Sequence, residues 1–229
     1  TMKLKKIASL MLAGVMAVSM LAGCSTTAVD PEPTPDPDPV PATGYSVELA
    51  ANLSDAAKKD YITYEDNADD IAALEDALGN MSSTTTAAGA VLPKVVVPVN
   101  KCVAFEDTKY VISDLVDSLG LMDINSTMTV DSMYDLWDTE SYGSDTVKYG
   151  ALFVVDGTVD VNKALAQTAD YMEGLLETLA NVNNDTVARY TFDYTVSASV
   201  ANQALEPFAG YTLSANFILV TVTRVATAA

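Results

Sequence analysis

The last quarter of the chain carries the pattern that most limits its fold. From residue 189 to residue 200, apolar or aromatic side chains alternate with polar ones. One set is Tyr190, Phe192, Tyr194, Val196, Ala198 and Val200, and the other is Arg189, Thr191, Asp193, Thr195, Ser197 and Ser199. Successive side chains of a β-strand point to opposite faces, so this pattern predicts a strand with one buried face. Residues 211–225 are rich in β-branched side chains and predict a second long strand.

We expect these two strands to pair antiparallel through a link at residues 201–210, which contains Pro207 and Gly210. Further strands are predicted at residues 95–105 and 148–155. Asp156 and Gly157 follow the second of these strands and predict a tight turn.

Helices are predicted at residues 66–78, 108–119 and 161–180, with a short one at 132–138. The longest has Asp160 as its expected N-cap. Its apolar stripe consists of Leu165, Thr168, Met172, Leu175, Leu176 and Leu179. The fold class expected is therefore α+β: an antiparallel sheet with long C-terminal strands, packed against several amphipathic helices on one face.

The beginning of the chain has the layout of an export signal. Lys3, Lys5 and Lys6 precede an apolar run at residues 7–21, which is too short to span a bilayer comfortably. The run ends in Leu21-Ala22-Gly23-Cys24. This segment resembles the lipobox of bacterial prolipoproteins. The resemblance implies a signal peptide at residues 1–23, a lipid on Cys24, and an exported protein held at the cell membrane or cell surface.

Residues 24–44 are expected to form the lipidated cysteine and a spacer. Six of the nine prolines lie between Pro31 and Pro41, interspersed with acidic residues. Such a sequence favours polyproline II, and at about 3.1 Å per residue it could hold a domain roughly 60 Å from the lipid. Residues 45–229 remain for a single extracellular domain.

The charge of the chain limits its partners. It has 31 acidic and 12 basic residues and a net charge of −19. Residues 1–23 hold three lysines and no acid, so the mature chain has 9 basic residues and a net charge of −22. Such a surface opposes nucleic-acid binding, which relies on basic contacts to phosphate. Membrane attachment is therefore expected through the lipid alone.

The chain contains two cysteines. With Cys24 lipidated, no intramolecular disulfide is expected. Cys102 lies in an apolar, strand-like stretch and is expected to be a small buried side chain.

The absence of histidine excludes several kinds of enzyme. Catalysis of the Ser-His-Asp or Cys-His type needs an imidazole, as do the common zinc enzymes. No P-loop and no dinucleotide-binding motif occurs. Carboxylates are abundant, but Asp66, Asp69 and Asp70 fall in the first turn of a predicted helix, where acids favour the helix dipole. Enzymatic activity is therefore uncertain, and a non-enzymatic role is favoured.

Calcium is the one cofactor that the sequence suggests, and only weakly. Oxygen ligands recur at alternate positions in Asp123, Asn125, Thr127 and Asp131, which resembles part of an EF-hand or dockerin loop. Met128 stands where such a loop needs glycine, and Tyr134 stands where a carboxylate should close the site. A polar turn leading into a helix is the alternative. No other cofactor is expected.

The segment most suggestive of a ligand site surrounds Trp137, the only tryptophan. Tyr134, Trp137, Asp138 and Tyr142 would offer aromatic faces for stacking on sugar rings and acceptors for hydroxyl groups. In the alternative interpretation, Trp137 anchors a short helix in the core.

Three functions remain open from the sequence. The first is a non-enzymatic surface lipoprotein that binds or adheres to a glycan or a surface protein. The second is a structural subunit of a pilus-like surface assembly, joined by strand addition. The third is a carboxylate-dependent hydrolase, which needs two opposed carboxyl groups about 5–9.5 Å apart.

Overall fold

A five-stranded sheet runs through the part of the chain that the computed structural model describes, which is residues 44–81, 92–102, 108–122, 145–183, 189–208 and 211–229. All of these residues belong to one compact unit, Pro37–Ala229. The elements in chain order are α1 (Tyr45–Ala51), β1 (Ile62–Tyr64), α2 (Ala68–Gly79), β2 (Val97–Pro98), the 3-10 helix η2 (Val99–Lys101), α3 (Thr108–Leu119), β3 (Val147–Asp156), α4 (Val161–Thr178), β4 (Tyr190–Phe208) and β5 (Tyr211–Ala228).

The strands are ordered β1-β4-β5-β3-β2. β4 and β5 form a long antiparallel hairpin, and β3 pairs antiparallel with the other edge of β5. β2 is antiparallel to β3, whereas β1 runs parallel to β4. The predicted α+β class, with long C-terminal strands packed against helices, is confirmed.

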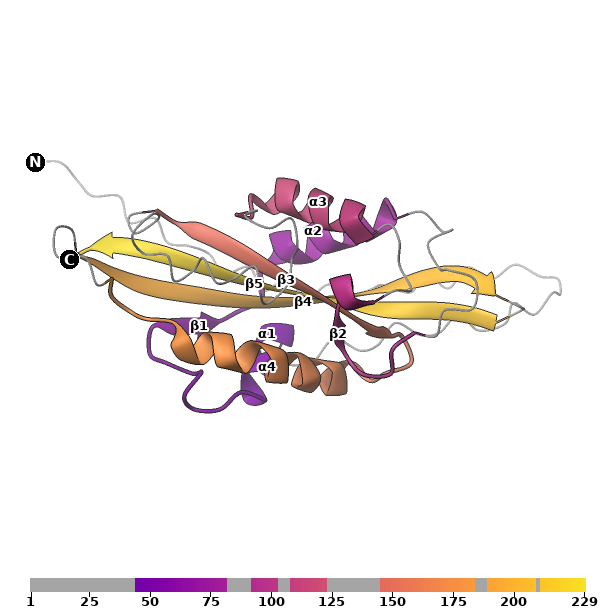
Figure 1. Cartoon of the computed structure of the whole chain (residues 1–229), viewed down its shortest axis with the longest axis horizontal. Coiled ribbons are helices and arrows are strands. Elements are labelled where there is room, and N and C mark those ends of the chain that lie inside the picture. Colours follow the sequence, from indigo (N-terminus) through magenta and orange to yellow (C-terminus); the bar gives the residue numbers. More distant parts are fainter. Residues whose placement is uncertain (1–43, 82–91, 103–107, 123–144, 184–188, 209–210) are drawn as a thin grey trace, which may run out of the picture. The chain divides into compact units, whose positions relative to one another are not determined.

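Helices cover both faces of this sheet, so the expectation that they share one face is wrong (Figure 1). Tyr149, Phe153 and Val155 of β3 point into the core that contains α1 and α4. Leu152 and Val154 point into the second core, which contains α2 and α3. β3 is therefore buried on both sides, and its continuous apolar run is typical of a strand between two helical layers.

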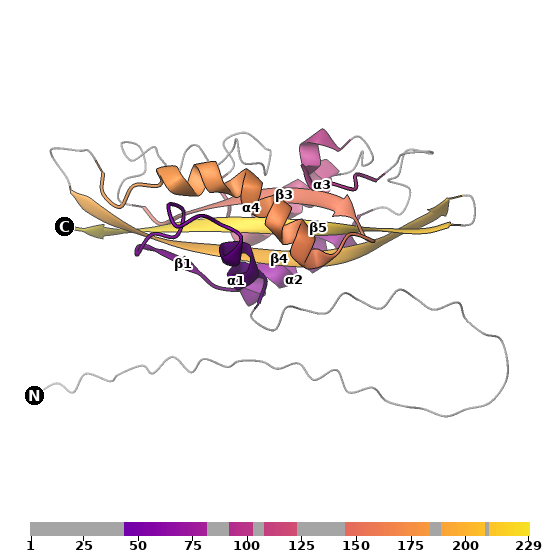
Figure 2. The same ribbon diagram turned by 90° about the horizontal axis from the view of Figure 1, so that it is seen from below.

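The helix α4 carries the chain across β5, because β3 and β4 lie on opposite sides of that strand. Figure 2 shows α4 along the sheet with α1 beside it. Asp160 accepts a hydrogen bond from the backbone N–H of Lys163, as its predicted N-cap role requires. The predicted turn before it is also present, since the N–H of Val159 donates to the carbonyl of Asp156.

Two predicted segments differ from the structure. Residues 95–105 were expected to form a strand, but within the described part of that range, 95–102, only Val97–Pro98 pairs with β3 before the backbone turns into η2. Residues 201–210 were expected to link two strands, but β4 continues to Phe208, and its register shifts between Leu205 and Phe208. Pro207 falls within that irregularity, where a ladder tolerates a missing N–H.

Candidate functional site

All nine predicted site residues lie outside the described residues. This applies to Cys24, to the calcium candidates Asp123, Asn125, Thr127 and Asp131, and to the ligand candidates Tyr134, Trp137, Asp138 and Tyr142. Each of these assignments stays a prediction. Cys102 is described, and it is buried in the core beneath α2 and α3, as expected.

The described residues contain no cluster of three or more His, Cys, Asp or Glu side chains arranged to hold a metal ion. Among those same residues, no helix is long and apolar enough to cross a membrane.

The most unusual polar group of the described chain is a buried ion pair between α2 and the sheet. Asp70, in the first turn of α2, is fully buried. Its Oδ1 contacts the Nζ of Lys148 on β3, and its Oδ2 accepts a hydrogen bond of 2.6 Å from the hydroxyl of Thr221 on β5. These side chains meet because Thr221 pairs with Gly150 in the ladder. Gly150 is two residues after Lys148 on β3, so Lys148 and Thr221 point to the same face of the sheet. We call this group the Asp70 cluster.

Polar residues of β4 extend the contact between α2 and the sheet. The hydroxyl of Ser197 accepts a hydrogen bond from the backbone N–H of Asn67, the N-cap residue of α2. Ser197 and Ser199 are both buried. The alternation placed them on a solvent-facing side of the strand, and this is wrong because α2 covers that side.

A second buried carboxylate, Asp156, lies at the other end of β3. Its Oδ2 is 2.8 Å from the Nζ of Lys94, and its Oδ1 accepts hydrogen bonds from the N–H and the hydroxyl of Thr158. Burial raises the pKa of Asp156, but the hydrogen bonds from Lys94 and Thr158 and the charge of Lys94 outweigh it. The pKa is therefore held below its ordinary value.

The backbone beside Asp156 is packed closely against the β4–β5 hairpin. A Cβ at Gly157 would lie 2.1 Å from the hydroxyl oxygen of Ser214, so only glycine fits there without a shift. Asn202 donates a 2.7 Å hydrogen bond to Asn216, which in turn donates to the carbonyl of Val159. These polar groups hold the turn that follows β3.

The two buried carboxylates cannot act as one catalytic pair. Asp70 accepts a hydrogen bond from Thr221, whose ladder partner Gly150 lies six residues before Asp156 on β3. At about 3.3 Å per residue, this separates the two carboxyl groups by roughly 20 Å. Glycoside hydrolases need carboxyl groups about 5–9.5 Å apart. The described buried acids therefore do not support the hydrolase alternative.

A buried arginine lies on the opposite face of the sheet from the Asp70 cluster. Arg224 of β5 is fully buried, and its guanidinium carbon is 4.7 Å from the centre of the Phe192 ring. Burial raises the pKa of Tyr194 to about 12, the charge of Arg224 opposes that rise, and Tyr61 adds to it. Burial also raises the pKa of Tyr64 to about 12.

These two tyrosines predict a loss of stability at alkaline pH. The hydroxyl of Tyr64 donates to the carbonyl of Ala57, and that of Tyr194 donates to the carbonyl of Ala180. Below about pH 10 both tyrosines are protonated in the folded and unfolded chains, and their contribution to stability is complete. As pH rises from about 10 to 12, the unfolded chain loses these protons first, so the free energy of unfolding should fall.

Urea unfolding between pH 9 and pH 12 measures this loss. The variants Tyr64→Phe and Tyr194→Phe should each have a shallower pH dependence than the native chain. An unchanged slope in both variants would contradict the assignment.

In the part of the chain that the structure describes, the outer edge of β4 is hydrogen-bonded to other segments along its first half but not along residues 200–204. The N–H of Phe192 donates to Asn181, that of Tyr194 to Tyr61, and that of Ala198 to the hydroxyl of Ser46. Alternation makes Val200, Asn202 and Ala204 the next outward residues. No backbone group of the described residues bonds this part of the edge, although the side-chain amide of Gln203 donates a hydrogen bond to the carbonyl of Ala204. We call residues 200–204 the open edge of β4.

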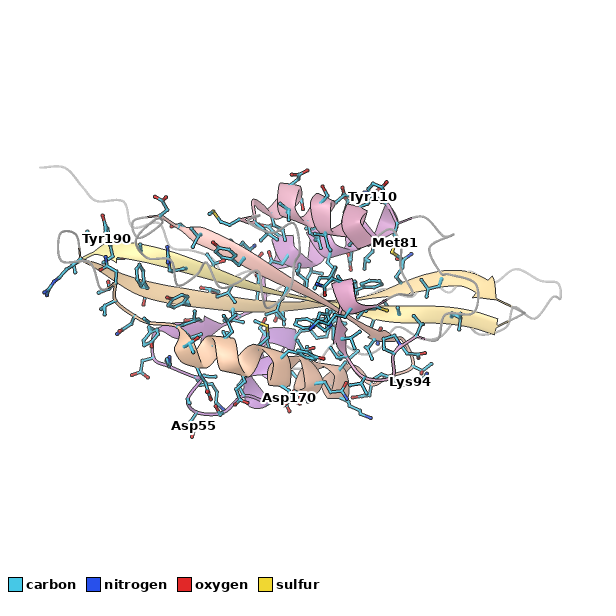
Figure 3. All side chains as sticks on the ribbon, viewed as in Figure 1. Asp55, Met81, Lys94, Tyr110, Asp170 and Tyr190 are labelled. Carbon is cyan, nitrogen blue, oxygen red and sulfur yellow. The ribbon has the colours of Figure 1, made fainter. Side chains whose placement is uncertain are left out.

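Exposed aromatic residues are spread over different elements. Figure 3 shows Tyr110 on α3 and Tyr190 at the start of β4, far from each other. The side chain of Tyr110 is 58% exposed, whereas Tyr171 of α4 is partly covered by its ring contact with Phe153. An aromatic patch of the kind predicted around Trp137 is not formed by these described side chains.

Comparison of the chain with protein-family models, with curated proteins and with solved structures finds no match.

Proposed function

We propose that this chain is a lipid-anchored cell-surface protein that acts by non-enzymatic binding or adhesion. The lipobox resemblance ending at Cys24 and the proline-rich spacer support the location. The observation that carries the non-enzymatic role is the use of the buried carboxylates. Asp70 and Asp156 are each paired with a lysine and built into the contacts between helices, turns and sheet. Neither is presented to a substrate.

A glycan is the ligand that the aromatic segment around Trp137 favours. We expect the mature chain to bind at least one polysaccharide on a glycan array. Replacing Trp137 with alanine should weaken this binding about tenfold or more, because loss of a ring stacked on a sugar costs on the order of 1.5 kcal/mol.

The matched control is Tyr110→Ala, which removes an exposed aromatic side chain from α3. Equal losses in both variants would contradict a site at Trp137. If the chain binds none of the carbohydrates tested, a glycan ligand is excluded, and a surface protein remains as the ligand.

A structural subunit of a surface assembly is the second candidate, and the open edge of β4 favours it. β5 is paired on both sides over Ala215–Arg224, so it is not available for strand addition there. The open edge carries no charged residue over residues 200–204, although charges are what natural sheets commonly use to block edge pairing.

Placing a charge on this edge tests the assembly. If copies join through it, the native mature chain should form oligomers at high concentration, and Ala204→Lys should shift them to monomers in sedimentation analysis. Ala51→Lys, on the exposed end of α1, makes the same change of charge elsewhere and should leave the oligomers intact. A native chain that is monomeric at every concentration would contradict this second function.

A further inference from the structure

The Asp70 cluster brings an amine and a carboxyl group into contact where water is largely excluded. The side chain of Asp70 is 0% exposed and that of Lys148 is 17% exposed. Their contact joins α2 to β3 across 78 residues of the chain. We infer that Asp70 and Lys148 form an intramolecular amide, an isopeptide bond, with the loss of one water molecule.

The reaction balances without any further reactant. A proton passes from the ammonium of Lys148 to the carboxylate of Asp70, which leaves a neutral amine beside a neutral acid. The amine nitrogen then attacks Cγ of Asp70, and a new C–N bond forms. One C–O bond breaks, and the oxygen leaves as water with two hydrogens that were on the lysine nitrogen. The product is a neutral amide between the two side chains.

Thr221 is placed to polarise the carboxyl oxygen that stays in the amide, while the oxygen that faces Lys148 takes up the protons and leaves. Its hydroxyl donates to Oδ2 of Asp70, while Lys148 contacts Oδ1. The hydrogen bond draws electron density from the carboxyl group, which makes Cγ more electrophilic. In a site that excludes water, such an oriented donor acts more strongly than it would in solution.

Burial and positioning both favour the product. Two buried charges carry a desolvation cost, which a neutral amide removes. The rigid attachment of Asp70 to α2 and of Lys148 to β3 makes the reaction intramolecular. Well-oriented groups of this kind react as if at effective concentrations of about 10⁵–10⁸ M. Because Lys148 is slightly exposed, the released water can leave.

Mass spectrometry of the full mature chain tests the bond directly. The native chain should be lighter than its sequence mass by one water molecule. Proteolysis should yield a branched peptide that joins Asp70 to Lys148, and trypsin should not cleave after Lys148. The measurement is made on fresh protein and again after prolonged incubation, so that slow formation is detected.

Three variants separate the bond from a simple ion pair. Lys148→Arg keeps the positive charge but lacks the amine, so it should fold and have its full sequence mass. Asp70→Ala should also have its full mass. Thr221→Val removes the hydroxyl at similar volume and should slow formation of the bond at least tenfold. A native chain at full sequence mass, or a water loss located at other residues, would overturn the inference.

Discussion

Replacing Cys24 with serine should release this protein from the membrane. A thioether-linked diacylglyceryl group carries two acyl chains, and each buried CH₂ contributes about 0.8 kcal/mol to membrane binding. Serine offers no thiol for that group. A chain that begins at Cys24, as proposed, would have a net charge of −22, which opposes binding to anionic lipids, so no electrostatic attachment would replace the anchor. The measurement is detergent-phase partition and membrane fractionation of cells that express either form.

The control for this experiment is Ser25→Ala, which changes the next residue and keeps the thiol. It should stay in the detergent phase with the native chain. A Cys24→Ser form that remains in the membrane fraction after a high-salt wash would show that the anchor lies elsewhere.

Replacing Asp70 with alanine should cost about 3–5 kcal/mol of the free energy of unfolding, the usual effect of removing one partner from a buried ion pair. The change leaves the Nζ of Lys148 beside an apolar core and removes the acceptor of the Thr221 hydroxyl. Urea unfolding measures the loss. Asp69→Ala is the matched control, because Asp69 is exposed in the same turn of α2 and should contribute less than about 1 kcal/mol through the helix dipole.

A double variant distinguishes the ion pair from the covalent bond. Asp70→Leu with Lys148→Met removes both charges, and replacing a buried pair by apolar residues is often close to neutral. If only an ion pair is present, the double variant should recover most of the stability that Asp70→Ala loses. If the amide bond is present, the double variant should stay less stable than the native chain by about 4 kcal/mol. The reason is that a covalent link that closes a loop of 78 residues restricts the unfolded native chain.

The long strands and helices could be predicted because their patterns are local. The alternation of residues 189–200 reports the β4 backbone directly, and α3 spans Thr108–Leu119 as its apolar spacing and the following glycine indicate. The short elements α1 and β1 were not predicted. A strand of three residues and a helix of seven have little stability of their own. They persist here because α1 and β1 pack on β4, contacts that no local pattern contains.

The burial of Asp70 was not predicted, and the reason is different. Asp69 and Asp70 look alike in the sequence, since both are acids in the first turn of a helix. Only the packing of α2 on the sheet exposes one and buries the other. A lysine at position 148, at the start of an otherwise apolar strand, was the one available sign, because a buried lysine needs a partner. The partner lies 78 residues away and could not be identified by spacing.

The position of β5 limits when this domain can fold. β5 lies between β3 and β4 in the sheet, yet it follows every other described element along the chain. Until β5 is available for pairing, β3 and β4 have no strand between them to complete the sheet. The apolar faces of α2 and α4 then have only part of the sheet surface on which they pack. A chain threaded through an export channel from its N-terminus therefore stays open until residues 211–228 have crossed. On the proposed export route, folding would therefore be completed only on the far side of the membrane.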